Sequence, residues 1–164
     1  TSYQIYRSTA KDGDYQNIKT INSVGTSSWT DGSVKTGKTY YYKIKTVVKT
    51  QNGEQTSGFS NVKSAKAVPA KTTLKAKASD AKNVKLTWSK VKGASGYEIY
   101  RSNSKDGKCS KVKTISKGST TSYKNGKLKK STTYYYKIRA YRKVNGKKVY
   151  GSYSSVVSVK TKAK

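Results

Sequence analysis

The sequence contains the segment Tyr97-Glu98-Ile99-Tyr100-Arg101-Ser102, which repeats the earlier segment Tyr3-Gln4-Ile5-Tyr6-Arg7-Ser8 with a single substitution. The same offset carries Tyr40-Tyr41-Tyr42-Lys43-Ile44 onto Tyr134-Tyr135-Tyr136-Lys137-Ile138. Self-similarity at a constant offset is the signature of a structural unit that occurs more than once. We therefore interpret the chain as two copies of one module.

The two copies differ in what precedes this segment. The second copy has additional residues before Tyr97, including Val84-Lys85-Leu86-Thr87-Trp88, and the first copy has no equivalent of them. The only proline, Pro69, interrupts the end of the first copy. We expect residues 1–68 to form a partial module that lacks its first two strands, and residues 69–164 to form a complete one. The strands missing from the first copy could lie outside this sequence or come from a neighbouring chain, or the half-module could be stable without them.

Apolar and polar residues alternate within each copy. The chain holds 15 Tyr, 2 Trp and 1 Phe, and it has no Met. Alternation with period two, together with aromatic and β-branched residues, is typical of half-buried β-strands. This pattern predicts an all-β fold whose second copy has strands at 73–78, 83–89, 95–102, 109–115, 120–124, 132–143 and 148–161.

Several of these residues resemble those of the fibronectin type III domain. They are Leu86-Thr87-Trp88, the segment Gly96-Tyr97-Glu98-Ile99-Tyr100, and Leu128 followed six residues later by Tyr134. The resemblance implies an immunoglobulin-like β-sandwich in which Trp88 packs in the core. It also implies a tyrosine corner at Leu128 and Tyr134, in which a tyrosine hydroxyl bonds to backbone. In the first copy Tyr40 takes the place of Tyr134.

The chain offers little for catalysis or for binding a metal or cofactor. It has no His and one Cys, so a nucleophile activated by histidine is excluded. Its seven acidic residues are scattered, and several precede glycine in predicted turns, so they form no ligand cluster with recognisable spacing. We expect a protein that is not an enzyme and has no catalytic residue, metal or cofactor.

The positive charge is large and unevenly distributed. Residues 1–67 hold 10 basic and 4 acidic residues, whereas residues 68–164 hold 26 and 3. A field of this strength attracts polyanions. No motif of a specific DNA- or RNA-binding protein is present, and no apolar run is long enough to span a membrane. The charge alone does not indicate whether the binding partner is nucleic acid, teichoic acid, acidic polysaccharide or an anionic membrane surface.

One predicted strand face combines aromatic rings with cations. By alternation we expect Tyr100, Tyr135, Lys137, Arg139 and Tyr141 to project outward from adjacent strands, with Lys111, Lys113, Lys127, Lys129 and Lys130 extending the positive field. Such a face could contact a polyanion or a glycan, because rings stack on sugars or bases while cations hold phosphates or carboxylates. The alternative is that aromatic pairs stabilise the sheet and lysines protect its edges.

The repeat and the Lys-rich sequence with its Tyr-Tyr-Tyr-Lys-Ile segments are similar to those of modules in large surface or secreted proteins of Gram-positive bacteria. This resemblance implies an extracellular structural and adhesive spacer, joined to other domains of its parent protein and attached to anionic wall polymers or polysaccharide. One alternative is an accessory carbohydrate-binding module of a polysaccharide- or wall-degrading enzyme. Another is a self-assembling fibre subunit in which a strand of a neighbouring chain completes residues 1–68.

Overall fold

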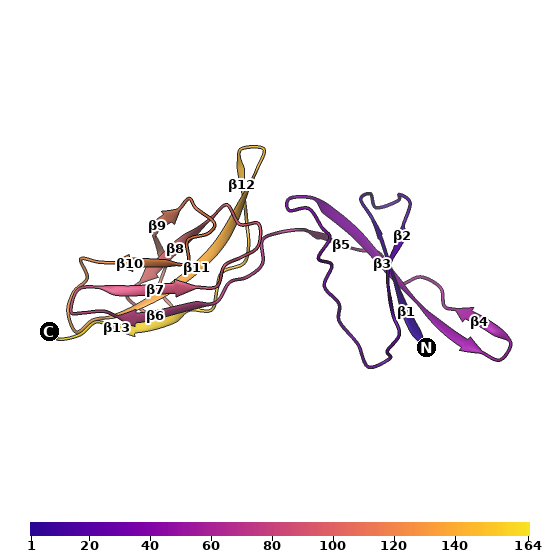
Figure 1. Ribbon diagram of the computed structural model, residues 1–164, viewed down its shortest axis with the longest axis horizontal. Helices are drawn as coiled ribbons and strands as arrows, with labels where there is room; N and C mark the ends of the chain where they lie inside the picture. Colours follow the sequence, from indigo (N-terminus) through magenta and orange to yellow (C-terminus); the bar gives the residue numbers. More distant parts are fainter. The chain divides into compact units, whose positions relative to one another are not determined.

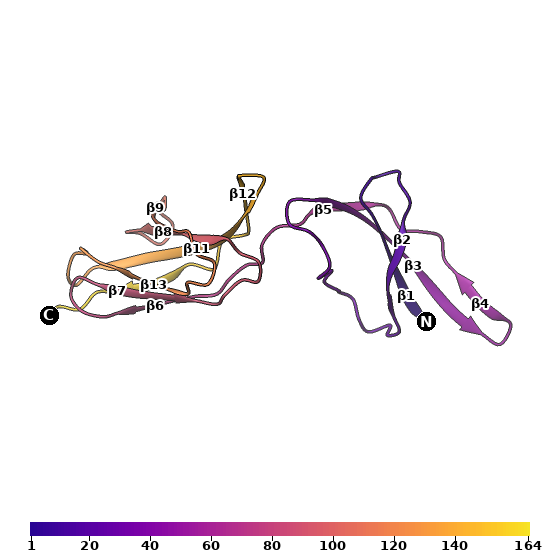
Figure 2. The ribbon, with the colours of Figure 1, turned by 45° about the horizontal axis from the view of Figure 1, so that its top comes forward.

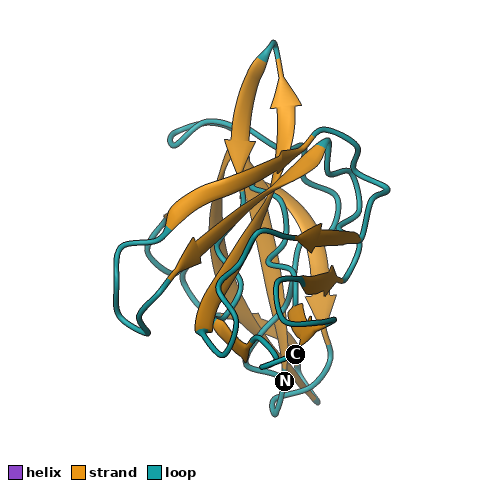
Figure 3. Ribbon diagram, turned by 90° about the vertical axis from the view of Figure 1, so that its left-hand side faces the viewer, coloured by secondary structure: helices purple, strands orange, loops and turns teal.

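The computed structural model describes residues 1–164 and contains strands and loops only (Figure 3). It divides into two compact units, Thr1–Ala67 and Val68–Lys164, which we call unit 1 and unit 2. The thirteen strands all pair antiparallel. No helix of the length and apolar character needed to cross a membrane is present.

Unit 2 is a sandwich of two sheets (Figure 1). One sheet has the order β10-β7-β6; the other has the order β12-β11-β8-β9, with β13 also pairing with β11. The strands are β6 (Leu74–Ala78), β7 (Val84–Trp88), β8 (Gly96–Ser102), β9 (Ser110–Ile115), β10 (Ser122–Asn125), β11 (Thr133–Val144), β12 (Lys147–Tyr150) and β13 (Val157–Lys160).

The core of unit 2 is formed by the inward-facing residues of both sheets. Alternate residues of β7 and β11 are buried, as a strand with one face on the core requires. The fully buried side chains include Leu86, Tyr97, Ile99 and Ile138, and the Trp88 ring centroid lies 5.4 Å from that of Tyr97. Apolar side chains from two facing sheets thus enclose one continuous core.

Each unit contains a tyrosine corner, in which a tyrosine hydroxyl bonds to the backbone of a loop. In unit 2 the backbone N–H of Lys129 donates to the hydroxyl of the buried Tyr134 at 2.9 Å. In unit 1 the backbone N–H of Lys35 donates to the buried Tyr40 hydroxyl at 3.0 Å. Each bond satisfies a backbone donor in a loop and fixes that loop against the following strand.

Unit 1 contains a single sheet. Its order is β2-β1-β3-β4, and β5 pairs with the first half of β3 whereas β4 pairs with the second half (Figure 2). The strands are β1 (Ser2–Ser8), β2 (Gln16–Ile21), β3 (Thr39–Thr50), β4 (Gly53–Thr56) and β5 (Lys63–Lys66). This sheet has the same strand order as the five-stranded sheet of unit 2, but unit 1 has no second sheet.

The missing sheet changes the burial of equivalent residues. Ile138 of unit 2 is 0% exposed, whereas its counterpart Ile44 in unit 1 is 42% exposed. The fold is therefore an all-β sandwich, complete in unit 2 and reduced to one sheet in unit 1.

The predicted strand 148–161 is wrong as a single element. The structure divides it into β12, which pairs with the end of β11, and β13, which pairs with its beginning. Between them Ser154 interrupts the ladder, because its Oγ accepts the Ile138 N–H at 3.1 Å while its own N–H donates to the Ile138 carbonyl at 2.7 Å. The preceding turn contains Asn145 and Gly146 at φ 48° and 75°, which suits a two-residue hairpin.

Candidate functional site

The five residues of the predicted aromatic and cationic face lie on one side of the five-stranded sheet of unit 2. Strands β8 and β11 pair so that Tyr100 is opposite Lys137, and Gly96 is opposite Tyr141. Tyr135 and Arg139 share this side of β11, because they alternate with the buried Tyr136 and Ile138.

The expected exposure of Tyr141 is wrong. Its side chain occupies the predicted side of the sheet but is only 1% exposed. The ring lies against Gly96, where any Cβ would collide with the Tyr141 hydroxyl, and that hydroxyl donates to the Ile115 carbonyl at 3.3 Å. Tyr150 packs against its edge, with ring centroids 6.1 Å apart. Tyr141 is therefore a packing residue and offers no ring face to a ligand.

A buried carboxylate on this side of the sheet accepts hydrogen bonds from several neighbouring side chains. Glu98 is 1% exposed, and its Oε2 accepts the Tyr100 hydroxyl at 2.7 Å and Arg139 Nη2 at 2.9 Å. Its Oε1 accepts Lys148 Nζ at 3.0 Å and the Tyr150 hydroxyl at 3.0 Å. Lys111 Nζ approaches the same oxygen at 3.5 Å. We call these six residues the Glu98 cluster; they come from β8, β9, β11 and β12.

The electrostatics of the cluster keep Glu98 ionised. Burial raises the pKa of Glu98, but hydrogen bonds from Tyr100, Arg139, Lys148 and Tyr150 outweigh burial and lower that pKa to about 2. Burial and the hydrogen bond to Glu98 both raise the pKa of Tyr100, so its hydroxyl remains a donor. The cluster is thus a carboxylate held as an anion by two hydroxyl donors and three cations.

Three aromatic rings of this side, those of Tyr100, Tyr150 and Tyr153, contact the protein's own cations. The Arg139 guanidinium carbon lies 3.7 Å from the ring centroid of Tyr150 and 4.9 Å from that of Tyr153. Lys137 Nζ lies 4.4 Å from the Tyr153 ring centroid, and Tyr100 packs edge-on against the same ring at 5.2 Å. These cation–π and edge-to-face contacts stabilise the sheet, so stacking of a flat ligand would have to displace them.

The sequence interpretation missed several members of this group. Glu98 lies in the repeated segment but is not among the predicted site residues, and neither are Lys148, Tyr150 and Tyr153. A signal was present, since β12 follows an Asn-Gly turn that returns the chain alongside β11. The alternation of Lys148 and Tyr150 on that returning strand places both on the same side of the sheet as Arg139, which lies opposite Glu98.

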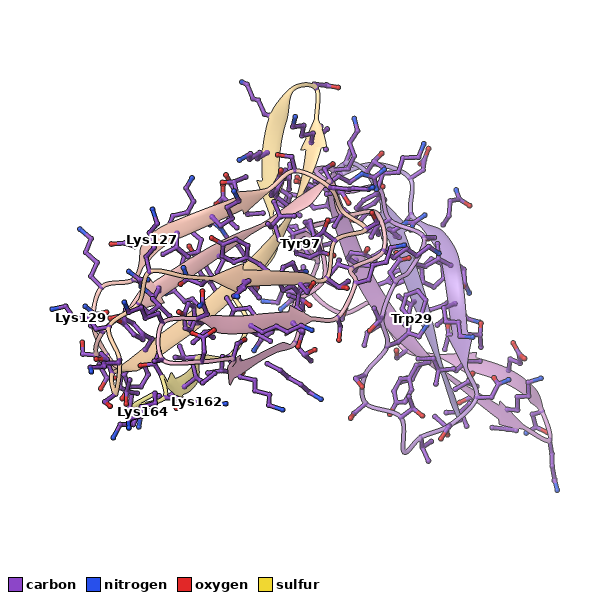
Figure 4. The ribbon with its side chains drawn as sticks, turned by 60° about the vertical axis from the view of Figure 1, so that its left-hand side comes forward. Trp29, Tyr97, Lys127, Lys129, Lys162 and Lys164 are labelled. Atoms are coloured by element: carbon purple, nitrogen blue, oxygen red, sulfur yellow. The ribbon has the colours of Figure 1, made fainter.

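A second group of cations lies at one end of unit 2. We define the lysine end as the exposed side chains of Lys82, Lys127, Lys129, Lys130, Lys162 and Lys164. Figure 4 shows Lys127, Lys129, Lys162 and Lys164 gathered at the same end of the unit. Hydrogen bonds to backbone carbonyls hold the loops together, because Thr161 Oγ1 donates to the Lys129 carbonyl at 2.7 Å and the Leu128 N–H donates to the Lys82 carbonyl at 3.0 Å.

The acidic residues of unit 2 compensate little of this charge at the surface. Glu98 is buried within its cluster. The Asp80 carboxylate, next to the lysine end, accepts the Lys82 N–H at 2.8 Å and the Asn83 side-chain amide at 2.8 and 2.9 Å. The third acid, Asp106, is exposed in the loop between β8 and β9. The surface of unit 2 is therefore strongly positive. Separately, no group of three or more His, Cys, Asp or Glu residues that could hold a metal ion occurs in the chain.

Similarity to known proteins is found at the level of structure. No protein-family profile matches the sequence, and no curated protein sequence matches it. The crystal structure of the FN1–FN3 domains of chicken CNTN1 matches with a TM-score of 0.51 at 20% identity. The match covers 98% of this chain and 56% of that one. The chain thus spans little more than half the length of that structure.

Two further structures match over about three fifths of this chain. The sixth fibronectin type III domain of human fibronectin type III domain containing protein 3 matches with a TM-score of 0.50 at 18% identity, over 61% of this chain and 92% of that one. An Fn3-like protein from Clostridium thermocellum matches with a TM-score of 0.47 at 28% identity, over 58% and 92%. The matches to the CNTN1 domains and to the sixth human domain establish the fold as a fibronectin type III β-sandwich.

Proposed function

We propose that this chain is a non-catalytic structural and adhesive module of an extracellular protein, and that unit 2 attaches it to anionic polymers. The parent protein is a secreted or cell-surface multidomain protein of a Gram-positive bacterium, and the polymers are those of its wall, such as teichoic acid. The fold supports a structural role, since sandwiches of this kind serve as modules in many surface proteins.

The observation that carries the adhesive part is the uncompensated charge of unit 2. Residues 68–164 hold 26 basic and 3 acidic residues, and the only fully buried acid already binds three of those cations. Most of the lysines are exposed and unpaired, so they are available to phosphate or carboxylate groups. Binding of this kind depends on the release of counterions and falls steeply with salt.

The lysine end is the surface that we assign to the polymer. It groups six exposed lysines on segments that are joined to one another by hydrogen bonds to backbone carbonyls. The Glu98 cluster has the opposite property, since its cations are already paired with a carboxylate or packed on rings. We therefore expect the lysine end to contribute more to polymer binding than the face predicted from the sequence.

A pair of matched variants tests this assignment. In the first, Lys127, Lys129, Lys130 and Lys162 are each changed to Gln. In the second, the same change is made at Lys90, Lys92, Lys143 and Lys147, which are exposed near the other end of β11. Retention on immobilised teichoic acid at low salt should fall at least about tenfold for the first variant and much less for the second. Equal losses would contradict the assignment to the lysine end, and absence of binding by the unmodified chain would contradict the adhesive role.

The carbohydrate-binding alternative has fewer free aromatic rings for stacking on a sugar than the sequence predicts. It relied on Tyr100, Tyr135 and Tyr141 as stacking rings, but Tyr141 is buried and Tyr100 is engaged by Glu98 and Tyr153. Only Tyr135 keeps an outward ring without such a partner. Neutral glycans in the same assay test this alternative directly.

A further inference from the structure

The outer face of the three-stranded sheet in unit 2 carries a row of lysines. Its strands β6, β7 and β10 lie side by side (Figure 1), and they pair so that Lys77 is opposite Lys85 and Lys85 is opposite Lys124. All three side chains are exposed, because they alternate along their strands with inward-facing residues such as Val84 and Leu86. We call Lys77, Lys85 and Lys124 the lysine row.

No acidic side chain is paired with the lysine row. Like charges directly opposite one another repel and destabilise a sheet, and none of these three lysines makes an ion pair. Asp80 is near enough to Lys124 for the two charges to interact, but its carboxylate accepts hydrogen bonds from the Lys82 N–H and the Asn83 side-chain amide. The row therefore presents an uncompensated positive charge to the solvent.

A second row on the same face supplies hydroxyl groups. Thr87 lies across the sheet from Lys75 on one side and from Ser122 on the other. Each is two residues along its strand from a member of the lysine row, which separates the two rows by about 7 Å, while neighbouring strands are about 5 Å apart. Hydroxyl and ammonium groups both bind phosphate oxygens. The face thus combines cations and hydroxyl donors within the reach of a short stretch of polymer.

The face has no aromatic ring directed to the solvent. The aromatic residues of its three strands, Trp88 and Tyr123, pack in or against the core. Binding to bases or sugars by stacking requires such rings, so a ligand of this face is held by charge and hydroxyl contacts alone. A flexible chain can also bend to bring successive phosphates to successive lysines, which the stiffness of duplex DNA opposes. These properties fit a flexible polymer of phosphate groups.

The lysine row continues the lysine end. Lys124 of β10 is three residues from Lys127, and Lys85 of β7 is three residues from Lys82. We propose that a linear polyphosphodiester runs from the lysine end onto the outer face of the three-stranded sheet and lies across Lys124, Lys85 and Lys77. This inference rests on the proposed attachment of unit 2 to anionic polymers, and it assigns the path and the chemical class of the polymer.

Two variants of the full chain with equal net charge test this path. The row variant carries Lys77→Gln, Lys85→Gln and Lys124→Gln. The control variant carries the same change at three exposed lysines that are not opposite one another, which are Lys90, Lys92 and Lys147. Binding of a poly(glycerol phosphate) chain to each protein is measured at several salt concentrations, and the logarithm of the binding constant is plotted against the logarithm of the salt concentration.

The slope of this plot reports how many phosphates are contacted. Each contact with a flexible strand contributes about 0.7 to the slope, so the row variant should have a slope shallower by about 2 and about tenfold weaker binding at low salt. The control variant should keep the slope of the unmodified chain. Equal slopes for the two variants would overturn the path, although binding by the unmodified chain would still uphold the attachment. Absence of binding by the unmodified chain would overturn both.

Duplex DNA in the same titration tests the class of polymer. The row variant should change the slope less with the duplex than with poly(glycerol phosphate), because a stiff duplex contacts fewer lysines of the row. A larger change with the duplex would overturn the assignment to a flexible polyphosphodiester.

A further measurement needs no polymer. Because the three lysines repel one another, the row variant should resist urea better than the unmodified chain at low salt, and this gain should shrink as salt screens the charges. The control variant should show a smaller gain. If the row variant gains no more than the control, the row carries no uncompensated charge and the proposal fails.

Discussion

Arg139 Nη2 donates to Glu98 Oε2 at 2.9 Å, and the same guanidinium lies over the ring of Tyr150. The residues are opposite one another on β11 and β8, with side chains on the side of the sheet that faces away from the core. A charged pair on that side would ordinarily be solvated and contribute little. Here Glu98 is 1% exposed, so its contribution depends on all of its donors remaining in place.

Replacing Glu98 with Gln should destabilise unit 2 by about 2–4 kcal/mol. The substitution keeps the shape of the side chain but leaves Arg139 and Lys148 without their carboxylate, and removing one partner of a buried ion pair is costly. Urea denaturation, followed by the NMR resonances of unit 2, measures the change. Asp106→Asn is the control, because Asp106 is exposed and should change stability by less than about 0.5 kcal/mol. A similar stability of the two variants would contradict the role of the cluster.

The stability of unit 2 should fall in acid. The pKa of Glu98 in the folded protein is about 2, below its ordinary value of 4.5. Between these values the unfolded chain binds more protons than the folded one, so stability is present above about pH 4.5 and is lost as pH falls towards 2. The loss should be on the order of 3 kcal/mol. Denaturation curves at pH 6 and pH 3 should differ less for Glu98→Gln than for the unmodified chain, and an unchanged difference would contradict the assignment.

The equivalent isoleucines of the two units should respond differently to truncation. Ile138→Ala removes a fully buried side chain and should cost about 2–5 kcal/mol in unit 2. Ile44→Ala removes a side chain that is already 42% exposed and should cost less than about 1 kcal/mol in unit 1. Hydrogen exchange resolved by residue measures each unit separately. Equal costs would mean that the face of unit 1 is covered in solution.

The tyrosine corner of unit 2 offers a comparison between adjacent residues. Tyr134→Phe leaves the Lys129 N–H without its acceptor and should cost about 1–2 kcal/mol. Tyr135→Phe, on the opposite side of β11, should be nearly neutral, because Tyr135 is half-exposed. Thermal unfolding of the two variants measures the difference, and its absence would contradict the contribution of the corner bond.

Much of the fold could be predicted from local pattern. Period-two alternation identifies the inward residues of β7 and β11, because one face of each strand lies on the core. The lack of any counterpart to Val84–Trp88 before Tyr3 predicts that two strands are absent from unit 1, but it does not predict that Ser28–Asp31, the counterpart of β10, forms no strand either. These features follow from short stretches of sequence and from the repeat.

The site could be predicted only in part, because it depends on which strands become neighbours. Alternation places Tyr141 on the outer side of β11, but burial of its ring comes from Tyr150 on β12 and from the close approach of Gly96 on β8. Glu98 is buried for the same reason, since its donors lie on four strands. The break between β12 and β13 depends on the Oγ of Ser154 accepting a backbone N–H.

Binding of the full chain to a panel of polymers across a salt series tests whether unit 2 attaches the protein to anionic polymers. The panel contains teichoic acid, DNA, a heparin-like glycan, neutral xylan and starch. We predict binding to the polyanions with a binding constant whose logarithm falls linearly and steeply with the logarithm of salt concentration, and no binding to the neutral glycans. Salt-resistant binding to one neutral glycan, or no binding to any polyanion at low salt, would contradict it.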